Sequence, residues 1–165
     1  MPLDQNALTA LTTQLTTAFT SGQAGGGSSD SIALLIAAAY DTYAKNAISC
    51  AGVGPTLVKF SDLQTKKKEA LSGTNPTPAA AAQKWADALD AYWEGSLFGA
   101  TGSVVTVGGA TGYIATLTGV FGIFTNTIPV IAQQIAQAME SYTKLVLVRD
   151  SAVPPPSGCG PSPIS

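Results

Sequence analysis

The chain has 165 residues, a length typical of one domain. Hydrophobic residues make up 45% of it, whereas charged residues make up only 11%, under half the usual value of about 25%. The net charge of −2 lacks the basic excess of nucleic-acid-binding proteins, so we expect no direct, sequence-specific nucleic-acid contact. With so few charges, we expect uncharged polar side chains, or a neighbouring subunit, to cover much of the surface.

Residues suited to catalysis or metal binding are scarce. The chain has no histidine, which removes the commonest general base and the commonest metal ligand. Cys50 and Cys159 lie too far apart in sequence for a metal-site spacing, and a disulfide between them stays an open alternative. The first residues do not resemble a secretory signal, so we expect reduced thiols of cytosolic origin.

We therefore predict no catalytic, cofactor-binding or metal-binding residue and no cofactor. An enzyme built from this chain would have to work through carboxylates, lysine, tyrosine or serine.

The first predicted helix covers residues 4–20, with Asp4 as N-cap and Gly22 at its end. Its apolar residues recur at steps of three and four, which places them in one stripe. These candidate docking residues are Leu8, Leu11, Leu15 and Phe19. A flexible Gly/Ser linker follows, so the helix can fold back on its own domain or dock on a neighbour, and folding back is favoured.

A second helix is predicted over residues 31–50, with Asp30 as N-cap. It is apolar around most of its circumference, which is typical of a central helix. Residues 54–60, where Pro55 precedes "TLVKF", are expected to form a short extended segment.

The third predicted helix runs over residues 62–72, where Ser61 and Gln64 form a capping-box pattern. Lys67 projects into the middle of its apolar face, so either its stem snorkels to water or the helix is only partly buried. The run of three lysines that includes Lys67 is interpreted as a solvated helix face.

The fourth predicted helix extends from Thr77 and Pro78, a cap and a first-turn proline, to about Glu94. One side of it carries Trp85, Leu89, Tyr92 and Trp93, and the opposite side carries Asp87, Asp90 and Glu94. We interpret the aromatic side as a buried packing stripe. A subunit interface and a ligand-stacking platform are the alternatives. The acidic side is interpreted as a solvated polar face.

Residues 95–139 contain no charged residue. A short strand is expected at 103–107 and another at 144–148, with helices between them that break near Pro129. Because residues 113–132 are about as long as a membrane span, insertion of this segment is the alternative interpretation. Its threonines, glycines and proline, and the lack of flanking basic residues, argue against a membrane partner.

These elements predict a mainly α single domain of about five or six amphipathic helices with minor β content. The expected organisation is an N-terminal helix at 1–21, a Gly/Ser linker at 22–29, a helical core domain at 30–149 and a Pro/Gly-rich arm at 150–165. The arm is expected to be extended and to take no part in the core.

Three segments resemble small structural proteins of the neck, collar or tail region of tailed bacteriophages. They are "NPTPAAAAQKWADALDAYWEG", the uncharged Gly/Thr-rich segment that follows it, and "IAQQIAQAMESYTKLVLV" running into "VPPP". The resemblance covers roughly residues 30–156, is compositional and carries over no site residue. It implies a non-enzymatic virion component, assembled in the host cytoplasm, whose partners are itself and other virion proteins. Low surface charge and terminal arms also favour a multicopy symmetric oligomer.

Overall fold

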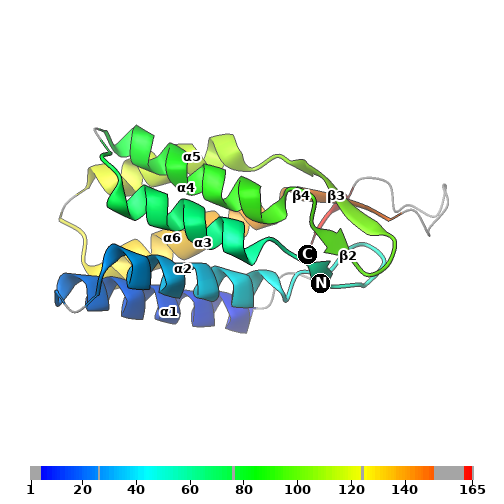
Figure 1. Cartoon of the computed structure of the whole chain (residues 1–165), viewed down its shortest axis with the longest axis horizontal. Coiled ribbons are helices and arrows are strands. Elements are labelled where there is room, and N and C mark those ends of the chain that lie inside the picture. The colour runs from blue at the N-terminus through cyan, green and yellow to red at the C-terminus, as the bar shows by residue number, and fades with distance from the viewer. Residues whose placement is uncertain (1–4, 26, 76, 124, 151–161, 165) are drawn as a thin grey trace.

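The computed structural model describes residues 5–25, 27–75, 77–123, 125–150 and 162–164. The chain is mainly α and forms a single helical domain (Figure 1). Within the described residues the helices are α1 (Gln5–Gln23), α2 (Ser29–Ala44), α3 (Phe60–Ser72), α4 (Pro78–Trp93), α5 (Ala110–Gly122) and α6 (Ile128–Thr143).

A small antiparallel sheet lies at one end of the helices (Figure 1). Its strands follow chain order: β1 (Pro55–Leu57), β2 (Leu97–Phe98), β3 (Gly102–Val107), β4 (Val146–Asp150) and β5 (Ser162–Pro163). The central pair is β3 with β4, which aligns Val104 with Val148 and Val107 with Val146. The sheet therefore joins segments that follow α2, α4 and α6.

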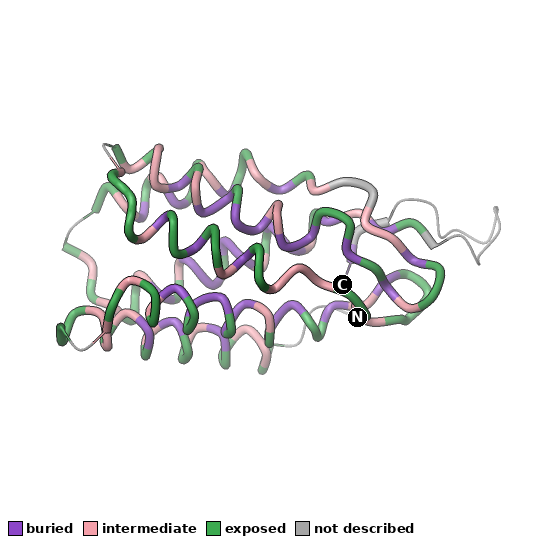
Figure 2. The backbone as a smooth tube through the Cα atoms, viewed as in Figure 1, coloured by how far each residue is buried: buried purple, intermediate pink, exposed green. Residues whose placement is uncertain are grey.

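The six helices form three hairpins around a common core. Helix α1 packs between α2 and α6, α3 between α2 and α4, and α5 between α4 and α6. Figure 2 shows the buried parts of each helix facing the interior of this bundle. The helices α2, α4 and α6 bury more residues than α1, α3 and α5, so the first three form the inner set.

The inner helices share a sequence repeat that helical periodicity alone did not reveal. Alanine occupies position 33 in α2, 82 in α4 and 132 in α6, and the pattern A-x₃-A-x-A-x-[DE]-x-Y continues from each. The sequence of buried, half-buried and exposed residues along these segments is almost the same in all three. The outer helices repeat too, since Leu15, Lys67 and Leu117 hold equivalent buried positions. The domain is therefore built from three helix–helix–strand units.

Hydrogen bonds tie the three inner helices together at the centre of the core. The indole Nε1 of Trp93 donates to Oη of Tyr40 at 2.8 Å. Oη of Tyr40 lies 2.8 Å from Oγ1 of Thr143, which itself donates to the Met139 carbonyl at 2.7 Å. All three side chains are buried, so this chain of hydrogen bonds satisfies polar groups that would otherwise destabilise the core.

Several predicted helix ends are wrong in detail. Ser28, not Asp30, caps α2, because its hydroxyl accepts a hydrogen bond from the Ser31 amide. Helix α3 begins at Phe60 and has no side-chain cap, so the capping box at Ser61 does not form. Helix α1 continues past Gly22 to Gln23. The Asp4 cap lies outside the described residues, whereas the Thr77 cap with Pro78 in the first turn of α4 is confirmed.

The end of the chain contradicts the prediction that the C-terminal arm takes no part in the core. Ser162 and Pro163 pair with β4, and the amide of Ile164 donates to the Val146 carbonyl at 3.1 Å. The Ile164 side chain is buried in the core. The last described residues therefore form one edge of the sheet.

Cys50 corrects a second expectation. This residue is disulfide-bonded, so its thiol is not reduced as we expected. The chain holds one other cysteine, Cys159, which lies outside the described residues.

Candidate functional site

The aromatic stripe of α4 lies in the core of the domain. Leu89, Tyr92 and Trp93 are fully buried, and Trp85 is 4% exposed. Trp93 stacks on Phe98 of β2 with ring centroids 5.9 Å apart, and Trp85 meets Phe121 of α5 edge-on at 5.6 Å. These side chains join α4 to its neighbours within the domain, and Trp85 also lines an apolar hollow of about 290 Å³.

The stripe of α1 packs on the same chain. Leu11 and Leu15 are buried, and Leu8 and Phe19 are half-buried against the core. Helix α1 therefore docks within its own domain in this structure, and its exposed surface is the opposite side. That side is rich in threonine.

Tyrosines of one repeat bind carboxylates of the preceding repeat. Oη of Tyr92 donates to Asp41 at 2.9 Å, and Oη of Tyr142 donates to Asp90. Burial raises the pKa of both tyrosines well above the ordinary value, so they stay protonated donors. Burial also raises the pKa of Asp90, against the opposing effect of the Tyr142 hydrogen bond. The solvated-face interpretation is thus wrong for Asp90, although Asp87 and Glu94 are exposed.

The third tyrosine of this set has no such partner. The Tyr43 hydroxyl is buried and forms no hydrogen bond in the structure. Its pKa is raised by burial and, secondarily, by the charge of Glu140. Glu140, the third carboxylate of the repeat, pairs instead with Lys144 at 2.8 Å. The tyrosine–carboxylate hydrogen bond therefore forms at two of the three equivalent positions. These residues form a structural network.

Lys67 is fully buried, which contradicts its interpretation as part of a solvated lysine run. Its Nζ lies 3.8 Å from the centroid of the Trp85 ring and donates to the Trp85 carbonyl at 3.4 Å. Burial lowers the pKa of this amine well below its ordinary value. Since the equivalent residues of the other repeats are Leu15 and Leu117, the position is one for an apolar side chain.

Charged residues are segregated around the bundle. Helices α2 and α3 carry ion pairs on their surface, such as Asp30 with Lys68 at 2.7 Å and Lys66 with Glu69 at 3.1 Å. Helix α4 carries the charged residues Lys84, Asp87 and Asp90. In contrast, α1 and α5 contain no charged residue, and α6 contains only Glu140. Because α1 and α5 both flank α6, these three helices form one continuous side, which we call the uncharged face.

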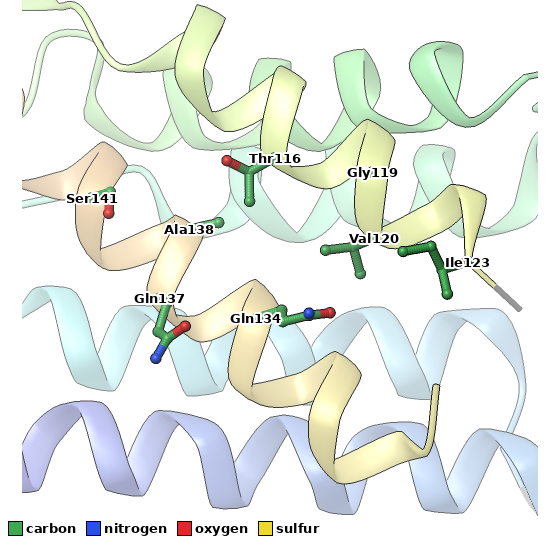
Figure 3. A pocket seen from close by; sticks show the side chains of 8 residues that line it. All are labelled: Thr116, Gly119, Val120, Ile123, Gln134, Gln137, Ala138 and Ser141. Atoms are coloured by element: carbon green, nitrogen blue, oxygen red, sulfur yellow. The ribbon is translucent and has the colours of Figure 1, made fainter. Parts of the chain in front are cut away.

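The uncharged face is furrowed on both sides of α6. A hollow of about 360 Å³ lies between α5 and α6, lined by Thr116, Gly119, Val120, Ile123, Gln134, Gln137, Ala138 and Ser141 (Figure 3). A second hollow of about 230 Å³ lies between α6 and α1, where Gln133 and Gln137 face Thr9, Thr12 and Thr13. Gln137 lines both hollows, so α6 is a ridge between two furrows.

Threonine hydroxyls on this face are already hydrogen-bonded within their own helices. In α1 the hydroxyls of six threonines donate to the carbonyl four residues earlier, at 2.8–3.1 Å. Thr116 and Thr118 of α5 do the same. Because these donors are already paired, less free energy is needed to desolvate this face when it enters an interface.

Among the described residues, no group of three or more His, Cys, Asp or Glu side chains could hold a metal ion. Within that part of the chain, no helix has both the length and the hydropathy of a membrane span. The segment 113–132 is divided between α5 and α6, which are separated by a turn.

The sequence carried one signal for the uncharged face, the charge-free stretch 95–139. It did not show that α1, distant in sequence, completes this face beside α6. Comparisons with known proteins give no further guide, because no family model, curated protein or solved structure matches the chain.

Proposed function

We propose that the protein is a non-enzymatic structural component of a tailed-phage particle, in its neck, collar or tail region. It assembles there in several copies through the uncharged face formed by α1, α5 and α6. The observation that carries this proposal is the segregation of charge to the opposite side of the bundle.

Depletion of charged residues is the compositional signature of the buried centre of protein interfaces. On the uncharged face, no described ion pair other than Glu140 with Lys144 would have to be desolvated on association. Exposed Ile123 and Val130, at the turn between α5 and α6, add apolar surface to it. The phage assignment rests on the sequence resemblance, and the assembly role rests on this face.

The chemistry of the core supports a structural role. The buried tyrosines and tryptophans bind other side chains of the same domain, and the Lys67 amine is shielded from solvent. In the folded chain a substrate would have no access to Tyr40, Trp93 or the Lys67 amine, which are fully buried.

The repeat supplies a matched pair of variants that tests the assembly role. Gln133 on α6 and Gln83 on α4 are equivalent exposed positions, one on the uncharged face and one on the charged side. We expect Gln133→Lys to block the association of the protein with further copies of itself or with the products of genes that flank its gene. Gln83→Lys should leave this association unchanged. Sedimentation velocity measures both.

Equal behaviour of the two variants in an assembling protein would contradict the proposal. Co-sedimentation of the wild-type chain with liposomes would instead favour the membrane alternative.

A further inference from the structure

We infer that the partner bound to the uncharged face is a second copy of this chain, related to the first by a two-fold axis that passes near α6, beside the furrow between α5 and α6. The inference rests on the proposed function, since it names the partner of the same face. Three properties of the described residues lead to a second copy.

The first property is the hydrogen-bonding chemistry of the furrow. Its polar lining consists of Gln134, Gln137, Thr116 and Ser141 (Figure 3). Amides and hydroxyls each carry both donors and acceptors, so such a side chain can pair with its own copy. In a two-fold interface, residues near the axis meet their own counterparts. Lysines or carboxylates in these places would repel their counterparts, and the lining of the furrow contains none.

The second property is the size of the face. Helix α6 has 16 residues, and at roughly 1.5 Å per residue it is about 24 Å long. Three helices spaced by about 9 Å make a face about 27 Å wide. The resulting outline of roughly 650 Å², before side-chain relief is added, approaches the ~800 Å² per partner typical of stable complexes.

The third property is the presence of three glycines on the exposed surface of α5. A Cβ built on Gly112, Gly119 or Gly122 would meet no atom within 4 Å, and none of these glycines has a positive φ. The fold of the single chain therefore gives no reason for glycine inside this helix, where it is unfavourable relative to alanine. The equivalent α3 positions, Asp62, Glu69 and Ser72, carry polar or charged side chains. A second copy approaching α5 closely would account for the difference.

The test uses the full chain with a leucine at two equivalent positions. Gly119→Leu places a bulky side chain in the furrow, and Glu69→Leu places it on the charged side. Both positions are exposed, so both variants should fold, with melting temperatures within about 4 °C of the wild type. We expect Gly119→Leu to weaken self-association at least tenfold in sedimentation equilibrium, and Glu69→Leu to leave it within about twofold of wild type.

Three outcomes would overturn the inference. Wild-type self-association that Gly119→Leu leaves unchanged, while Gln133→Lys abolishes it, excludes the close approach of a second copy to α5 but keeps the proposed function. A monomeric wild type that binds products of flanking genes through Gln133 also keeps the proposed function and excludes a second copy. Equal weakening by Gly119→Leu and Glu69→Leu would place the contact elsewhere.

Discussion

The two sides of the bundle bury equivalent positions in the core but expose different side chains. The side made of α2, α3 and α4 carries ion pairs and even buries the amine of Lys67, whereas α5, α6 and α1 expose threonine, glutamine and glycine. Because α3 and α5 are equivalent outer helices of two successive repeats, packing within the chain does not require the difference. We infer that the surface of α2, α3 and α4 is exposed to water, whereas the uncharged face contacts a partner.

The largest expected effect is on the core that both sides share. Trp93→Ala should lower the free energy of unfolding by about 3–5 kcal/mol, through loss of transfer free energy and formation of a cavity. The variant also removes the donor to Tyr40. Urea denaturation followed by circular dichroism measures the loss, and a change below about 1 kcal/mol would contradict the burial of this ring.

The disulfide of Cys50 should be next in size. Reduction, or Cys50→Ser, should destabilise the chain by about 2–4 kcal/mol, because a cross-link restricts the unfolded state. Thermal melts with and without reductant give the comparison. The Cys50→Ser variant is the control, since its melting temperature should not respond to reductant.

Lys67→Leu would make α3 resemble α1 and α5 at the equivalent position. It should stabilise the chain by roughly 1–3 kcal/mol at pH 7, because the poorly paired amine no longer has to be buried. Urea denaturation compares the two proteins. A destabilised variant would show that the contact between Lys67 and the Trp85 ring outweighs the burial of the amine.

The same residue predicts a pH dependence. The pKa of Lys67 is lowered by folding, so the unfolded chain binds more protons between the folded pKa and the unfolded value of about 10.4. Wild-type stability should therefore rise as the pH is raised from about 7 toward about 10, and the rise should be missing in Lys67→Leu. The buried tyrosines, whose pKa values folding raises, stabilise both proteins fully below the unfolded pKa of about 10, and this contribution is lost as the pH rises above that value.

The smallest expected effect distinguishes a tyrosine that donates a hydrogen bond to a carboxylate, such as Tyr92, from Tyr43, whose hydroxyl has no partner. Tyr92→Phe should cost about 1–2 kcal/mol, because it removes a hydrogen bond to the Asp41 carboxylate. Tyr43→Phe should be neutral or slightly stabilising, since its buried hydroxyl has no hydrogen-bond partner. Equal losses from the two variants in urea denaturation would mean that Tyr43 is bonded in solution.

The mainly α fold was predicted from helical periodicity, and most helix positions followed from it. Pairings distant in sequence could not be predicted, such as Ile164 returning to β4 or α1 lying beside α6, because no local pattern encodes them. The burial of Lys67 was missed because residue type suggested a solvated face. The threefold repeat was within reach of the sequence, since the alanines and tyrosines of α2, α4 and α6 recur every 49 or 50 residues.

The most direct test of the uncharged face as an assembly surface is hydrogen–deuterium exchange of the wild-type chain at low and high protein concentration. We expect added protection at high concentration to be confined to peptides from α1, α5 and α6. Added protection of α2, α3 and α4 instead, in an associating sample, would contradict an assembly role for this face.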